Sequence, residues 1–213
     1  ELSASQIAAL YSPQPLPSPW TNTDIGSPAS PGYANYASGT WSLGGGGADI
    51  WLASDQFQFA YQNFTNSGSL VARVSSGAII SDGTTNANAK TGIMFRDSLA
   101  ANAPFVALVH DQSQGLQFLH RDSPGALAGQ QGANIAANPA FWLRLVRSNN
   151  TFYAYYTPVS SVPAAADWIF IGSHTTPIAA AADAGLVVSA HNNSLLANAT
   201  FTDASLLPPT PPT

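Results

Sequence analysis

The stretch FWLRLVRSNNTFYAYYT, residues 141–157, decides the fold class of this chain. Two β-rich runs flank the pair Asn149-Asn150, and Asn tolerates the left-handed backbone that a tight hairpin turn requires. In the first run Trp142 and Arg144 alternate with apolar residues, which is the pattern of a strand with one face in a core. The stretch therefore predicts an antiparallel hairpin.

The rest of the chain repeats this pattern of short β-rich runs. Turn residues separate the runs about every 8–12 residues, a spacing typical of β-sandwiches, and only residues 3–11 carry a helical signal. This organisation predicts one all-β sandwich of antiparallel sheets over residues 21–206, with an extended N-terminal arm (1–20) and a Pro-rich tail (207–213). We expect strands near residues 39–43, 48–51, 55–62, 68–76, 90–97, 104–110, 115–121, 141–148, 151–157, 167–172, 184–191 and 197–205, and a turn or bulge at the glycines of 44–47.

Charged residues are scarce: six Lys and Arg and eleven Asp and Glu make up 8% of the chain, against about 25% in an average soluble domain. The net charge of −5 without a basic block argues against nucleic acid as a partner. No apolar run is long enough to cross a bilayer, so we expect no membrane insertion. The absence of cysteine excludes disulfides and thiolate metal sites.

Several features indicate a secreted or cell-surface protein. The polar surface must consist largely of Ser, Thr, Asn, Gln and Gly, and the chain begins at Glu1 without methionine, as expected of a processed mature form. Four N-x-[ST] sequons are glycosylation candidates: Asn63, Asn149, Asn192 and Asn198.

The chain resembles a family of secreted concanavalin A-like modules. The motifs that carry this resemblance follow one another from Trp20 to about Leu206: PWTNTDIGSP, GTWSLGGGGADIW, SDQFQFAYQ, LVARV, AKTGIMFRDSL, LQFLHR, FWLRLVRSNNTFYAYYTP, DWIFIGS and AGLVVSAHNN. Such modules are often appended to extracellular glycoside hydrolases and surface proteins. The resemblance implies a two-sheet jelly roll and, by analogy, sugar binding. It breaks at residues 159–166, where an Ala-rich stretch replaces the tight turn of the family.

Strand alternation predicts a polar outer face that could bind a ligand. Phe57, Phe59 and Tyr61 alternate into the expected core, and the polar residues of neighbouring runs point the other way. If these strands are neighbours, they form one face of Gln56, Gln58, Arg73, Lys90, Arg96, Gln117, Trp142 and Arg144.

This face allows two interpretations. Gln and Arg can bind sugar hydroxyls or carboxylates, and Trp can stack on a sugar ring. Alternatively, the cations pair with Asp49, Asp55, Asp97 or backbone carbonyls and hold loops. Trp20, Trp41, Trp51 and Trp168 could also serve as sugar platforms, although their place in the motifs favours packing.

No catalytic constellation is present, so we expect no enzyme activity. Hydrolysis by paired carboxylates needs two acids about 5–10 Å apart, and the one glutamate is Glu1. The four histidines are scattered (His110, His120, His174 and His191), and no G-x-S-x-G motif occurs. We expect no cofactor; the alternative is a structural calcium ion at Asp82-Gly83 or Asp111.

These observations predict a non-catalytic, extracellular module that binds a polysaccharide or oligosaccharide. The alternative is a structural subunit of an extracellular filament or surface layer that self-assembles through its N-terminal arm or tail. Apolar residues in the arm, such as Ile7, Leu10 and Leu16, would have to dock on their own sandwich or on a neighbour.

Overall fold

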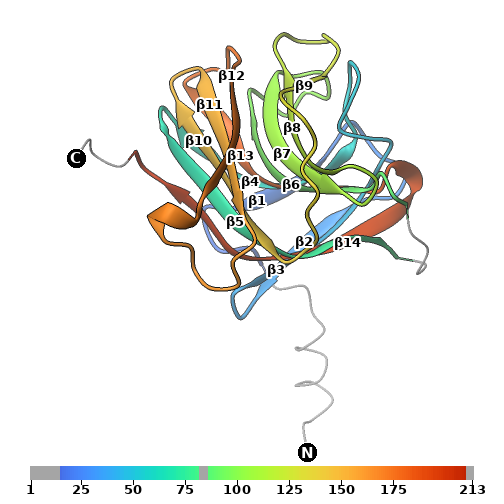
Figure 1. The fold of residues 1–213 in the computed structure, drawn as a ribbon. Helices are drawn as coiled ribbons and strands as arrows, with labels where there is room; N and C mark the ends of the chain where they lie inside the picture. The colour runs from blue at the N-terminus through green and yellow to red at the C-terminus, as the bar shows by residue number, and fades with distance from the viewer. Residues whose placement is uncertain (1–14, 82–85, 210–213) are drawn as a thin grey trace, which may run out of the picture.

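The computed structural model describes residues 15–81 and 86–209. They form fourteen β-strands and one short 3-10 turn, η1 (Ala165–Asp167) (Figure 1). The strands are β1 (Thr21–Ile25), β2 (Tyr33–Ala37), β3 (Thr40–Gly47), β4 (Phe57–Thr65), β5 (Gly68–Ile80), β6 (Lys90–Arg96), β7 (Phe105–Asp111), β8 (Gly115–Arg121), β9 (Gly129–Gln130), β10 (Phe141–Ser148), β11 (Thr151–Thr157), β12 (Ile169–Thr175), β13 (Ala181–Ser189) and β14 (Asn192–Leu207). Among these residues no helix is long and apolar enough to cross a membrane.

The strands form two antiparallel sheets of seven strands each. Sheet A has the order β1-β4-β13-β6-β7-β8-β9, and sheet B has the order β12-β11-β10-β5-β14-β3-β2. Strands distant in sequence lie side by side: β13 pairs with β4 and β6, and β14 pairs with β3 and β5. This arrangement confirms the predicted two-sheet jelly-roll sandwich.

The main hydrophobic core fills the space between the two sheets. Apolar residues of β5, β6, β8 and β10 lie in it and are at most 1% exposed: Leu70, Val74, Ile93, Phe95, Phe118, Leu143 and Leu145. Burying each of these side chains contributes about 1.5–3 kcal/mol. The alternation of the runs therefore located these strands correctly.

The predicted orientation of β4 is wrong. Phe57 and Phe59 are buried, but they belong to a second apolar cluster on the outer face of sheet A, whereas Ala60 points into the main core. Ile50 and Trp51, from the loop between β3 and β4, cover this second cluster. Alternation shows that Phe57 and Phe59 share a face, but it does not show which face lies between the sheets.

The glycines of 44–47 are strand residues, not a turn, and the expected irregularity is present as a register shift between β3 and β14 at Gly45 and Gly47. They end β3 in sheet B, where its backbone approaches sheet A. A Cβ on Gly45 would lie 1.9 Å from the carbonyl oxygen of Val188 in β13. Glycine is therefore required here because the two backbones meet. Residues 48–51, predicted as a strand, form part of a loop, and the strands β1, β2 and β9 were not predicted.

The described part of the N-terminal arm packs on its own sandwich. Leu16 and Trp20 contact the main core, and the rings of Trp20 and Trp41 lie 4.7 Å apart between centroids. The helical signal at residues 3–11 lies outside the described residues.

Candidate functional site

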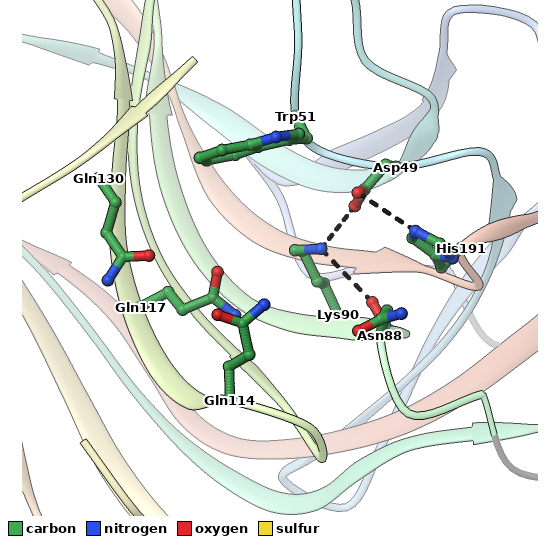
Figure 2. A pocket seen from close by; sticks show the side chains of 8 residues that line it. All are labelled: Asp49, Trp51, Asn88, Lys90, Gln114, Gln117, Gln130 and His191. Carbon is green, nitrogen blue, oxygen red and sulfur yellow. Dashed lines mark hydrogen bonds and ion pairs between the residues drawn. The ribbon is translucent and has the colours of Figure 1, made fainter. Parts of the chain in front are cut away.

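A polar hollow of about 270 Å³ opens on the outer face of sheet A, and we call it the Trp51 hollow. Lys90 begins β6, Gln117 lies in β8 and Gln130 ends β9, so the sheet supplies its floor. The remaining groups come from four connections, β3–β4, β5–β6, β7–β8 and β13–β14 (Figure 2). Its lining residues are Asp49, Trp51, Asn88, Lys90, Gln114, Gln117, Gln130 and His191.

Asp49 and Lys90 form an ion pair at one side of the hollow. The Nζ of Lys90 donates to Oδ1 of Asp49 at 2.7 Å, and the Nε2 of His191 lies 3.5 Å from Oδ2. The backbone N–H of Ile50 also donates to Asp49, at 2.7 Å. Asp49, the only carboxylate that the described part of the chain contributes to the lining, is thus neutralised and held in place by three neighbouring groups.

Side-chain amides form the opposite side of the hollow. The Nε2 of Gln117 donates to the buried Asp111, and the amides of Gln114, Asn134 and Gln130 form a hydrogen-bonded chain with distances of 2.8 and 2.5 Å. The amide oxygen of Gln117 has no partner among the described residues, so it can accept a hydrogen bond from a ligand. The hollow therefore offers neutral donors and acceptors, which match hydroxyl groups.

The indole of Trp51 supplies an apolar wall. In Figure 2 the amides of Gln117 and Gln130 and the Nζ of Lys90 lie on the same side of its ring plane. Its ring rests on the second apolar cluster and is half-buried. An aromatic face opposite several polar groups is suited to a ligand with one apolar and one hydroxylated side.

A buried ion cluster holds the loop that carries Asp49 and Trp51. Asp55, at the end of this loop, accepts hydrogen bonds from Arg96 at 2.7 Å and from Arg121 at 2.6 and 2.7 Å. Arg121 also donates to the carbonyl oxygens of Trp51 and Leu52 at 3.3 and 2.9 Å. Burial lowers the pKa of Arg96, and Asp55 opposes this effect. The cluster fixes the position of the loop relative to sheet A.

Four of the eight predicted ligand residues lie on the outer face of sheet A or in its loops, with different roles. Lys90 and Gln117 line the Trp51 hollow, whereas Arg96 is fully buried in the ion cluster. Gln56 bonds to the backbone of Ala48 and Gly26, at 3.1 and 2.9 Å. Gln56 therefore shapes the loop.

The other four predicted residues lie elsewhere, so the prediction of one shared face is wrong. Gln58 is buried, with its amide within hydrogen-bonding distance of Asn22 and Asp24. Arg73, Trp142 and Arg144 lie on the outer face of sheet B, where Trp142 is paired with Arg73. The two sheets present opposite outer faces, and alternation within each strand cannot assign a strand to a sheet.

The alternative interpretation is confirmed for two of the four cations of the predicted face, Lys90 and Arg96, and Arg121 and Arg147 outside that face behave in the same way. Lys90, Arg96 and Arg121 pair with carboxylates, and Arg147 donates to the backbone carbonyls of Ile178 and Ala179. Arg144 differs, because its guanidinium lies 5.8 Å from the ring centroid of Trp168. The aromatic surface around Arg144 is therefore a second place where a ligand could stack.

The sequons and the suggested calcium residues are distributed over the surface and the loops. Asn63, Asn149 and Asn192 are exposed, whereas Asn198 is half-buried and accepts a hydrogen bond from the Tyr33 hydroxyl at 2.8 Å. The carboxylate of Asp111 already accepts hydrogen bonds from Ser113, Gln114 and Gln117. Asp82 lies outside the described residues. Glycosylation and calcium binding stay predictions.

Sequence reasoning missed five residues of the hollow: Asp49 as a site residue, Asn88, Gln114, Gln130 and His191. Each lies in or next to a loop, except Gln130, which ends the two-residue strand β9. Trp51 was considered as a sugar platform but was assigned to packing. Loop residues carry no alternation signal, and only their meeting at one end of the sheet marks them as a site.

Comparisons with known structures support the fold class. The chain matches no family model, and no curated protein matches its sequence. A functionally unknown protein from Saccharomyces cerevisiae has a similar structure, with a TM-score of 0.65 and 14% identity over 89% of this chain and 97% of that chain. The carbohydrate-binding module CBM66 from Bacillus subtilis has a TM-score of 0.56 and 13% identity over 89% and 95% of the two chains. The exoplasmic/lumenal domain of VIP36, in its Ca²⁺/Man3GlcNAc-bound form, has a TM-score of 0.51 and 9% identity over 91% and 85%.

These likenesses establish the fold alone. The chain is a jelly-roll β-sandwich with a polar hollow, walled by one tryptophan, on the outer face of one sheet.

Proposed function

We propose that this protein is a non-catalytic, extracellular carbohydrate-binding module and that the Trp51 hollow is its binding site. The observation that carries the proposal is the indole of Trp51 facing the amides of Gln117 and Gln130 across the hollow. A sugar ring presents C–H groups on one side and hydroxyls around its edge, so it can stack on the indole and bond to the amides.

The size and charge of the hollow favour a neutral sugar. Its volume of about 270 Å³ is at the lower limit of small-ligand sites, about 300–1,000 Å³, so it would hold one or two sugar units of a longer chain. The charges of Asp49 and Lys90 cancel through their 2.7 Å ion pair. A neutral poly- or oligosaccharide is therefore preferred over an acidic one.

The same residues argue against hydrolysis. Hydrolysis of a glycosidic bond uses two carboxyl groups about 5–10 Å apart, and Asp49 is the only carboxylate that lines the hollow within residues 15–81 and 86–209. Asp111, which lies behind Gln117, is 1% exposed and already accepts three hydrogen bonds.

CBM66 and the sugar-bound VIP36 domain, which share this fold, show that it can present a sugar site.

The proposal is tested by electrophoresis in native gels that contain neutral β-glucans, fructans or mannans, where a bound polymer slows the protein. Titration with oligosaccharides of the polymer that retains the protein then measures the affinity. We expect Trp51→Ala to weaken binding at least tenfold, because one central aromatic anchor contributes about 2 kcal/mol or more. Trp51→Phe should restore part of the affinity. The wild type should leave the polymer unhydrolysed.

Trp168→Ala is the matched control, because it removes a half-buried tryptophan from the surface around Arg144 on sheet B. Its affinity should equal that of the wild type. Loss of binding in Trp168→Ala with full binding in Trp51→Ala would move the site to sheet B. Retention on none of the polymers, or release of sugar by the wild type, would refute the proposal.

Self-assembly through the N-terminal arm stays a prediction. Leu16 and Trp20 pack on their own sandwich, which favours a monomer. Light scattering of the full chain at high concentration distinguishes a monomer from a self-assembling subunit, because a subunit of a filament or layer would show masses above that of one chain.

A further inference from the structure

Two histidines that lie far apart in the sequence meet at the rim of the sandwich. His120 lies near the end of β8 in sheet A, and His174 lies in β12 at the edge of sheet B, so β8 and β12 contact each other here. Their rings stack with centroids 3.5 Å apart at an angle of 24°. The expectation that the histidines are scattered is therefore wrong for this pair.

Asp122 lies between the two histidines and collects their hydrogen bonds on one oxygen. Its Oδ1 is 3.0 Å from Nδ1 of His120, 2.8 Å from Nε2 of His174 and 2.9 Å from the hydroxyl of Thr176. Two ring nitrogens from different sheets thus point at the same place. The ligand atoms of the two histidines and the aspartate all lie within 4.8 Å of one another.

We propose that His120, Asp122 and His174 bind a divalent transition-metal ion, with zinc as the best fit, and that the ion joins the two sheets at this rim. In a tetrahedral zinc site with bonds of about 2.0–2.2 Å, neighbouring ligand atoms lie about 3.3–3.5 Å apart. The present separations of 2.8 and 3.0 Å need only a small expansion to reach this value. The side chain of Asp122 is 48% exposed and is free to make the adjustment.

The donor set selects the kind of metal. Two imidazole nitrogens and one carboxylate suit zinc, nickel, copper or iron(II), whereas calcium and magnesium prefer oxygen ligands alone. Thr176 or a water molecule would complete the coordination. The cluster is separate from the Trp51 hollow, whose histidine is His191.

The ring of His120 packs against Gly129 in the neighbouring strand β9. A Cβ on Gly129 would lie 2.9 Å from the Cε1 and Nε2 atoms of the His120 ring. The glycine therefore leaves room for the Cε1–Nε2 edge of the ring against β9, while Nδ1 lies 3.0 Å from Asp122. This packing holds one ligand in position before any ion binds.

The experiment titrates untagged, chelator-treated protein with Zn²⁺ by calorimetry and with Co²⁺ by absorption spectroscopy. Because the chain has no cysteine, a Co²⁺ spectrum reports nitrogen and oxygen ligands alone. We expect one Zn²⁺ per chain and a rise in the melting temperature on adding it. His174→Gln and Asp122→Asn should each weaken Zn²⁺ binding at least tenfold and abolish the rise.

His191→Gln is the matched control, because His191 also lies next to a carboxylate, 3.5 Å from Asp49. It should bind Zn²⁺ as the wild type does. Melting of each variant in the presence of chelator verifies that it is folded. The proposal is overturned if the wild type binds no Zn²⁺, if His174→Gln binds it with unchanged affinity, or if His191→Gln loses it. If the wild type binds no Zn²⁺ and chelator-treated His174→Gln melts at a lower temperature than the wild type, the cluster is a hydrogen-bonded contact between the sheets and not a metal site.

Discussion

Replacing Asp55 by Asn removes the central charge of the buried ion cluster. Asp55, Arg96 and Arg121 have fully buried side chains, and three hydrogen bonds of 2.6–2.7 Å join the one carboxylate to the two guanidinium groups. Asn has nearly the same shape, but it has one acceptor oxygen and carries an amide N–H that would face the guanidinium donors. Both arginines then remain buried without the carboxylate that they share.

The loss of stability caused by Asp55→Asn can be estimated from these contacts. Oδ2 of Asp55 accepts two of the three bonds and Oδ1 accepts one, so the amide introduced by Asp55→Asn keeps at most two of them, and each charge-assisted bond lost is worth about 1.5–3 kcal/mol. Breaking a buried ion pair by removing one partner typically costs about 3–5 kcal/mol. A chain of this size changes its melting temperature by about 2–4 °C per kcal/mol, so we expect Asp55→Asn to melt about 6–20 °C below the wild type.

Thermal unfolding followed by circular dichroism measures this difference, and urea unfolding provides the free energy. Asp203→Asn is the matched control, because it makes the same chemical change at an exposed aspartate in β14. A melting temperature of Asp55→Asn within about 2 °C of this control would refute the reasoning. Because the cluster holds the loop of Asp49 and Trp51, the variant should also lose affinity for any sugar that the wild type binds.

Two further predictions concern packing and pH. Gly45→Ala places a Cβ 1.9 Å from the carbonyl oxygen of Val188, and urea unfolding should show a free energy of unfolding lower by at least about 2 kcal/mol. Gly172→Ala is the control, because its Cβ would have its nearest neighbour at 3.6 Å, and it should change the free energy of unfolding by less than about 1 kcal/mol. Equal effects of the two substitutions would contradict the close approach of the sheets. Burial lowers the pKa of His110 below its ordinary value of 6.5, although the carbonyl of Ala137 and the charge of Asp111 oppose this. The folded state therefore resists protonation, and stability is lost as the pH falls through 6.5 toward the folded pKa. His110→Gln should lose less stability than the wild type between pH 7.5 and 5.5, and parallel pH profiles of the melting temperature would contradict this assignment.

Local sequence determined much of the β architecture. The hairpin of β10 and β11 begins and ends at the predicted residues, and Asn149 has the positive φ of 55° that the turn requires. Such hairpins depend on residues that are neighbours in the chain, so their pattern can be read directly. β1 and β2, with sequences TNTDI and YANYA, have too little apolar alternation for the same prediction.

Sequence by itself thus determined most of the strands, their alternation and the sandwich class, because these depend on local spacing and turn chemistry. Tertiary structure decided which side of each strand is inside, as Phe57 shows on the outer face of sheet A and Arg144 on the outer face of sheet B. It also decided both candidate sites, because the Trp51 hollow joins separate loops, and His174 meets Asp122 across 52 residues of chain. The physical reason is that alternation repeats every two residues in every strand, whereas the choice of face and partner depends on which strands the fold brings side by side.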